Sequence, residues 1–168
     1  MTPIVSIIMG STSDLPVMEK AAKFLDDMDV PFEMNALSAH RTPAEVESFA
    51  RNAKARGIRV IIAGAGMAAA LPGVIAASTT VPVIGVPIKG MLDGLDAMLS
   101  IIQMPPGIPV ATVGVNGAQN AAILAVEMLA LADEALAKHL EQYKDSLKEK
   151  IVKANAELAT VCYKNKTN

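Results

Sequence analysis

The chain has 168 residues and a net charge of −2, with 52% apolar and 19% charged residues. This length suits one domain with a substantial core, and the lack of basic stretches and of Trp argues against nucleic acid as the main partner. The apolar content exceeds that of ordinary soluble domains, so we expect part of the surface to be covered by copies of the same chain.

Short apolar runs alternate with helical patterns along most of the chain. The apolar runs predict strands at residues 5–9, 32–37, 60–63, 81–86 and 110–115. Helical spacing predicts helices at about 17–28, 43–53, 72–77 and 92–103. Because the strands lack polar alternation, they indicate a parallel sheet that is covered on both faces. We predict an α/β fold: a three-layer αβα sandwich around a doubly wound parallel sheet of five strands or slightly more.

No charged residue occurs between Arg59 and Lys89. Glycines and prolines divide this stretch into pieces shorter than the ~20 apolar residues that a membrane span needs. The lone Cys162 cannot form an internal disulfide, and no segment resembles a signal peptide. We therefore expect a cytoplasmic protein without a membrane partner.

The last third of the chain has a different character. Residues 118–132 are apolar nearly all round, which predicts a buried helix, and the charged sequence from Asp133 onward has the spacing of one long amphipathic helix. We divide the chain into an α/β catalytic domain, residues 1–132, and a C-terminal helical extension of the same domain, residues 133–168. We expect this extension to pack on a neighbouring subunit; the alternative is a helix folded back on its own domain.

The segment Ser38-Ala39-His40-Arg41-Thr42-Pro43 joins a strand to a helix. Thr42 and Glu45 have the spacing of a capping box, and Pro43 suits the first helical position. Histidine exchanges a proton near neutral pH, and an arginine at a helix N-terminus favours an anion. The combination is typical of a small-molecule active site, although a lone histidine more often caps a helix or packs in a core.

Two further turns follow expected strands, and parallel strands would bring them to the same edge of the sheet. Gly10-Ser11-Thr12-Ser13-Asp14 has hydroxyls and N–H groups for a phosphate, and Asp14 could accept hydrogen bonds from a ribose; plain helix capping is equally compatible. Gly64-Ala65-Gly66 lacks the third glycine of a dinucleotide fingerprint. His139 and Cys162 lie far from these turns in sequence, so we predict no metal site.

The sequences of these turns, and their order along the chain, resemble those of the class I 5-(carboxyamino)imidazole ribonucleotide mutases. This family is also known as the catalytic subunit of phosphoribosylaminoimidazole carboxylase. The matching segments are 10–14, 38–43, 64–66 with 71–73, and 103–105, within about residues 5–131. The resemblance implies an isomerase of de novo purine biosynthesis that needs no cofactor. It would move a carboxylate from the exocyclic nitrogen of the imidazole to ring carbon 4. It also implies a homo-octamer whose sites lie between subunits.

The resemblance implies a role for residues of all three turns. The substrate-binding set would be Ser11, Ser13, Asp14, Arg41, Gly66, Ala70 and Leu71. Within it, Ser11, Ser13 and Arg41 would hold the phosphate, and Asp14 would bind the ribose. The catalytic residues would be Ser38 and His40, with His40 giving a proton to nitrogen and later taking one from carbon 4.

The third turn departs from the family pattern, because Met67 replaces a glycine and Ala70 replaces a histidine. The methyl group of Ala70 cannot donate a hydrogen bond. The animal-type class, which carboxylates 5-aminoimidazole ribonucleotide directly with CO2, also lacks this histidine but usually has lysine at the position of Arg41. Direct carboxylation is therefore the alternative function, and a non-catalytic nucleotide-binding homologue is a further one.

Overall fold

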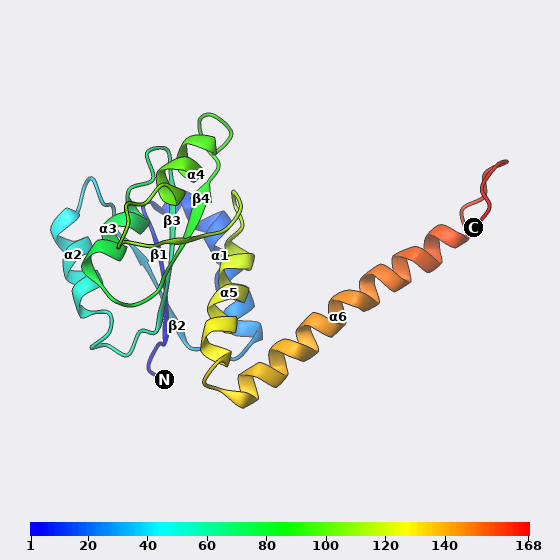
Figure 1. The fold of residues 1–168 in the computed structure, drawn as a ribbon, viewed down its shortest axis with the longest axis horizontal. Coiled ribbons are helices and arrows are strands. Elements are labelled where there is room, and N and C mark those ends of the chain that lie inside the picture. The colour runs from blue at the N-terminus through cyan, green and yellow to red at the C-terminus, as the bar shows by residue number, and fades with distance from the viewer.

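The computed structural model describes residues 1–168, and its body is a parallel sheet between two helical layers (Figure 1). The strands are β1 (Val5–Met9), β2 (Phe32–Ala36), β3 (Val60–Gly66), β4 (Val83–Ile88) and β5 (Ala111–Thr112). The helices are the 3-10 turn η1 (Thr12–Asp14), α1 (Leu15–Asp27), α2 (Pro43–Asn52), α3 (Leu71–Ser78), α4 (Leu95–Ile102), α5 (Ala118–Ala130) and α6 (Glu134–Ala159). The predicted three-layer α/β sandwich is confirmed.

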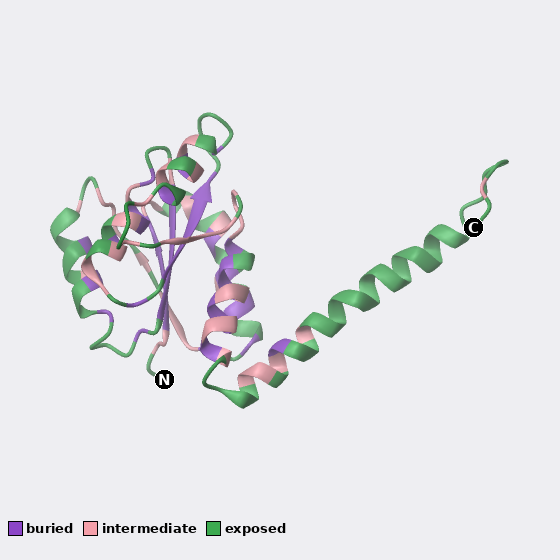
Figure 2. Cartoon of the chain, viewed as in Figure 1, coloured by how far each residue is buried: buried purple, intermediate pink, exposed green.

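Each face of the sheet has its own apolar core, because successive strand residues point to opposite faces. On one face, Ile7 of β1 packs with residues of α1 and α5. On the other, Ile8 packs with residues of α2, α3 and α4. Every residue of β1 and β4 is buried, which explains why these strands read as continuous apolar runs (Figure 2).

The strand order is β2-β1-β3-β4-β5, and all neighbouring pairs are parallel. Since β2 and β3 lie on either side of β1, the order reverses there, and the connecting helices α1 and α2 lie on opposite faces. In such sheets, ligands bind beyond the carboxyl ends of the strands at this switch point. The turns after β1, β2 and β3 all lie at this edge.

Strand β3 is longer than predicted, because Gly64, Ala65 and Gly66 pair with Val86, Pro87 and Ile88 of β4. The glycine at position 64 serves packing: a Cβ there would lie 2.5 Å from Sδ of Met18 on α1. The prediction that these three residues form a loop was therefore wrong. The loop begins at Met67.

Two other boundaries differ from the prediction. Helix α4 begins at Leu95 because Leu92, Asp93 and Gly94 have φ angles of +49°, +54° and +88°, which no helix accommodates. Strand β5 has only two residues, and after it the chain runs along β4 through single bonds, such as that from the N–H of Asn116 to the carbonyl of Pro87 at 2.8 Å.

The expected capping box at α2 is wrong. Pro43 does occupy the first turn, but Thr42 makes no side-chain cap and Glu45 does not reciprocate. The Thr42 hydroxyl instead accepts a hydrogen bond from the N–H of Ser38 at 2.9 Å and donates one to the carbonyl of Ser38 at 3.0 Å. These bonds close the turn that precedes the helix.

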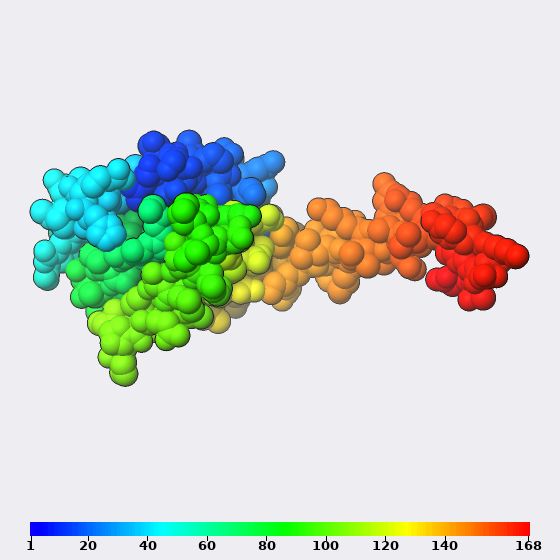
Figure 3. Space-filling view, turned by 90° about the horizontal axis from the view of Figure 1, so that it is seen from above, coloured from blue at the N-terminus to red at the C-terminus, as the bar shows by residue number.

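Helix α6 leaves the body and projects away from it (Figure 3). Its start is fixed by Asp133, whose carboxylate accepts from the N–H of Leu136 at 3.0 Å, and by Tyr143, whose ring lies 4.9 Å from that of Phe24. Beyond this base the helix is exposed, with Ile151 at 71% and Leu158 at 60% (Figure 2). No helix of the chain is both long and apolar enough for a membrane crossing.

Candidate active site at the carboxyl edge of the sheet

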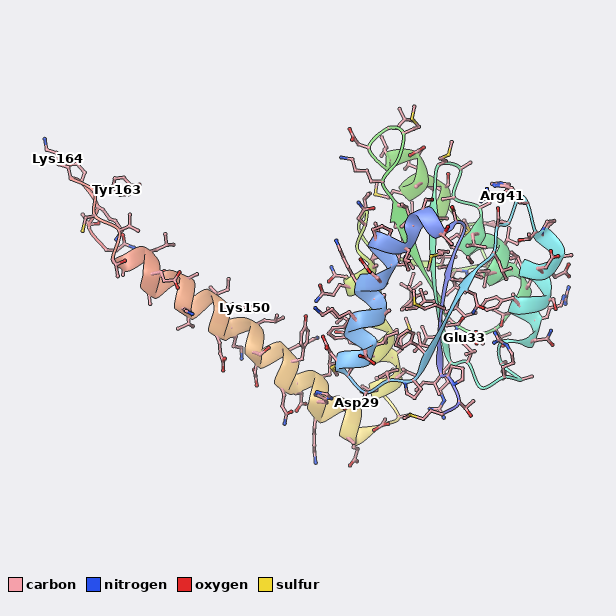
Figure 4. The ribbon with its side chains drawn as sticks, turned by 180° about the vertical axis from the view of Figure 1, so that it is seen from behind. Asp29, Glu33, Arg41, Lys150, Tyr163 and Lys164 are labelled. Atoms are coloured by element: carbon pink, nitrogen blue, oxygen red, sulfur yellow. The ribbon has the colours of Figure 1, made fainter.

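The turns after β1 and β2 are joined by Arg41. Its Nη2 donates a hydrogen bond to the carbonyl of Gly10 at 3.0 Å, and it lies beyond the carboxyl end of β2 (Figure 4). Gly10 in turn donates its N–H to the carbonyl of Gly64 in β3 at 3.3 Å. Thus two turns that are distant in sequence meet each other and strand β3 at the switch point, with a guanidinium between the turns.

The first turn gathers hydroxyl groups at its bend. The Oγ of Ser11 accepts hydrogen bonds from the N–H of Ser13 at 3.3 Å and from its hydroxyl at 2.9 Å. The Ser13 hydroxyl also lies 3.5 Å from Oδ1 of Asp14. Ser13 is exposed, while Ser11 and Asp14 are half-buried. The expected alternative, a cap on α1 from Ser13 or Asp14, fails for Asp14, which makes no capping bond, and it is Ser11 that caps the 3-10 turn η1.

The carboxyl group of Asp14 is electrostatically unusual. Burial raises its pKa, because it penalises the charged form. Hydrogen bonding with the backbone of Ser11 and the hydroxyl of Ser13, together with the positive charge of Arg41, offsets only part of this rise. The donors within the chain therefore do not fully compensate for burial of the carboxylate, and further donors from a ligand would stabilise it.

The second turn is rigid at its base and open at its tip. Besides the two Thr42 bonds, the N–H of Thr42 donates to the carbonyl of Ser38 at 2.8 Å, and the N–H of Arg41 donates to Oγ of Ser38 at 3.3 Å. His40 is exposed between these anchors, and its imidazole makes no hydrogen bond within the chain. Sequence reasoning missed the positioning role of Thr42, although a hydroxyl four residues after Ser38 was the available signal.

The third turn contributes no polar side chain. Gly66 ends β3, and Met67 follows with a φ of +57° and 63% exposure. Ala70 is half-buried at the start of α3, and Leu71 is 2% exposed in the core. Of the predicted binding residues here, Leu71 is therefore almost closed to a ligand in the single chain.

A cavity of about 820 Å³ lies elsewhere, at the amino ends of β4 and β5. Its lining includes Lys54, Val83 and Ala111 and none of the predicted site residues. No group of three or more His, Cys, Asp and Glu residues could hold a metal ion. The convergence of reactive groups, rather than cavity volume, thus locates the candidate site.

Comparisons with known proteins identify the family of the chain. Residues 4–150 match the family model for AIR carboxylase. The chain is 60% identical over 147 residues to an N5-carboxyaminoimidazole ribonucleotide mutase of Pyrococcus abyssi, covering 87% of this chain and 84% of that protein. It is 48% identical over 167 residues to the mutase of Thermotoga maritima, covering 99% and 98%.

A fungal relative is longer. The phosphoribosylaminoimidazole carboxylase of Schizosaccharomyces pombe is 52% identical over 165 residues, which are 98% of this chain but 30% of that protein. Among solved structures, Treponema denticola PurE2-S38D is similar with a TM-score of 0.85 and 31% identity, covering 94% of this chain and 99% of that one. Together, the matching family model, the sequence identities and the shared fold show that this chain belongs to the AIR carboxylase family.

Proposed function

We propose that this chain is an N5-carboxyaminoimidazole ribonucleotide mutase, an isomerase of purine biosynthesis. Several relatives at 48–60% identity carry this name. The observation that carries the proposal from the structure is the bond from Arg41 to Gly10, which brings the imidazole-bearing turn beside the hydroxyl-bearing turn. A nucleotide bound there would reach an anion site and a proton-transfer group at once.

The first two turns suit the ribose phosphate. Ser11 and Ser13 offer hydroxyls within 2.9 Å of each other, and Arg41 offers a guanidinium, so a phosphate could receive neutral and charged hydrogen bonds. Asp14 is acceptor-only when ionised, and its half-buried carboxylate would accept from ribose hydroxyls. In this arrangement the base of the nucleotide extends toward the second and third turns.

His40 and Ser38 would then face the imidazole and its carboxylate. In the first step the N–C bond breaks, its electron pair stays on nitrogen, nitrogen takes a proton from His40, and CO2 is released. In the second step carbon 4 supplies the pair for the new C–C bond, and its proton passes to His40. One imidazole can alternate between these roles near neutral pH, and CO2 must stay enclosed between them.

We further propose a homo-oligomer, an octamer by family resemblance, in which α6 packs on a neighbouring subunit and sites form between subunits. The exposed apolar residues of α6 and those of α4, Leu95, Leu99 and Ile102, support this proposal, since single chains rarely expose such stripes. Exposure of His40 in one chain also suits a site that a neighbour completes. A monomer in sedimentation experiments would contradict this part. We place the enzyme in the cytoplasm, where the free Cys162 would stay reduced.

A two-substrate assay tests the function. The protein is given 5-(carboxyamino)imidazole ribonucleotide, called here the carbamate nucleotide, or, separately, 5-aminoimidazole ribonucleotide with bicarbonate. Formation of the product that carries the carboxylate on carbon 4, the 4-carboxy product, is followed. We expect rapid product formation from the carbamate only. Equal rates from both would favour direct carboxylation, and saturable binding without turnover would favour a non-catalytic homologue.

A further inference from the structure

Met67 has a backbone conformation that its side chain does not favour. Its φ of +57° lies in the left-handed region, which costs a residue with a Cβ about 1–2 kcal/mol and which glycine adopts freely. The side chain is 63% exposed, so packing within the chain does not compensate for this strain. Strained residues of this kind cluster at functional sites, where the strain serves a contact that the free chain lacks.

Met67 lies at the edge of the sheet where the candidate site is. It is the first residue after β3, next to the strand end where Gly66 pairs with Ile88 and three residues beyond the part of β3 that pairs with β1. The Gly10 turn is bonded to β3 at Gly64, and Arg41 is bonded to Gly10. Met67 therefore stands at the same edge as the polar turns, on the side toward α3.

The third turn offers a ligand only apolar side chains. From Met67 to Leu71 every side chain is apolar, and Ala70 presents only a methyl group at the start of α3. Hydroxyls, carboxylate, guanidinium and imidazole all come from the other two turns. Apolar side chains hold water poorly, but they suit a small neutral molecule such as CO2.

We propose that Met67 closes this apolar turn over the CO2 that is formed between the two steps, and so limits its escape to solvent. This proposal rests on the proposed mutase function. The thioether is long, flexible and polarisable, so it can cover a small ligand without a fixed geometry.

The test measures how the carbamate nucleotide is divided between two products. One is the 4-carboxy product, and the other is 5-aminoimidazole ribonucleotide released when CO2 escapes, corrected for spontaneous decay. Met67→Gln keeps the length and the backbone strain but makes the side chain polar. We expect it to raise the released fraction by about 5-fold or more while Tm stays unchanged.

Two further variants separate strain from contact. Met67→Gly removes both, so we expect the same rise in the released fraction with a Tm that is equal or higher by about 1–3 °C. The matched control is Asp29→Gly, because Asp29 also has a φ of +57° but lies at the other end of the sheet from Arg41 (Figure 4). It should leave the released fraction unchanged.

The outcomes are distinct. A chain that converts none of the carbamate overturns the mutase function and this proposal with it. A chain that converts it with the same released fraction in Met67→Gln as in the wild type overturns this proposal alone. Dissociation of the oligomer in Met67→Gln, seen by sedimentation, would assign the side chain to a subunit contact and would also overturn it.

Discussion

The turns after β1 and β2 differ from the turn after β3 in the polarity of their side chains and in the bonds that hold them, although all three lie at one edge of the sheet. The first two are polar and tied to each other by Arg41 and Gly10, and the second is closed internally by Thr42. The third is apolar, begins at a strained and exposed Met67, and is held only by β3 and α3. Hydrogen-bonding side chains suit a charged nucleotide and apolar side chains suit neutral CO2, so under the proposed function the two regions would divide binding and retention between them.

The largest effect is expected at His40, which lies in the second of the two polar turns. His40→Asn removes the proton-transfer group, so kcat should fall about 10²–10⁴-fold while the oligomer stays intact. Steady-state kinetics and sedimentation measure both. His139→Asn, on α6 outside the site, is the control and should leave kcat unchanged. Near-normal turnover in His40→Asn would exclude His40 from the mechanism.

Arg41 tests the polar region by itself. Arg41→Ala removes both the bond to Gly10 and the charge offered to the phosphate, so nucleotide affinity should fall about 10–100-fold. Titration calorimetry with the carboxylated product measures it. Arg51→Ala removes an exposed arginine whose partner is Glu47, and it should have no effect. Equal affinities in the two variants would mean that Arg41 does not contact the phosphate.

A substitution of Gly64 tests how tightly strand β3 packs against Met18 of α1. Gly64→Ala would place a methyl group 2.5 Å from Sδ of Met18, so the free energy of unfolding should fall by about 1–3 kcal/mol. Denaturant unfolding measures this loss. In Gly114→Ala the new methyl group would meet nothing within 4 Å, and stability should hardly change. A Gly64→Ala protein as stable as Gly114→Ala would show that the Met18 side chain moves aside freely.

Asp14 is expected to give the smallest effect. Its pKa is raised in the folded protein, mainly by burial, so the unfolded state loses this proton first and folding stability falls as pH rises through that range. The loss persists at neutral pH. Asp14→Asn should therefore be equally or more stable than wild type at pH 7, with the difference shrinking in acid, while nucleotide affinity falls. Lower stability of Asp14→Asn at neutral pH would contradict the sign.

The sequence was sufficient for the architecture, because burial of both sheet faces leaves a plain signal in runs such as 5–9. It was insufficient wherever local chemistry met tertiary packing. Gly64 resembled a loop residue, but its missing Cβ makes room for Met18. Thr42 and Glu45 matched a capping box, but the Thr42 hydroxyl bonds to Ser38 instead.

The site was predictable in the same uneven way. The parallel-sheet topology predicted that the Ser11 and Arg41 turns meet, and the Arg41 bond to Gly10 shows that they do. Spacing could not reveal that Leu71 is buried or that the backbone of Met67 is left-handed, since both depend on how β3 enters α3. The left-handed residues 92–94 were hidden for the same reason.

The most direct test of the division between binding and retention follows the carbon of the migrating carboxylate. Carbamate nucleotide labelled with carbon-13 at this group is converted in a large excess of unlabelled bicarbonate, and the label in the 4-carboxy product is measured by mass spectrometry. The account predicts a product that keeps nearly all of the label. A product in which the label is diluted to the level of the solvent pool would contradict it.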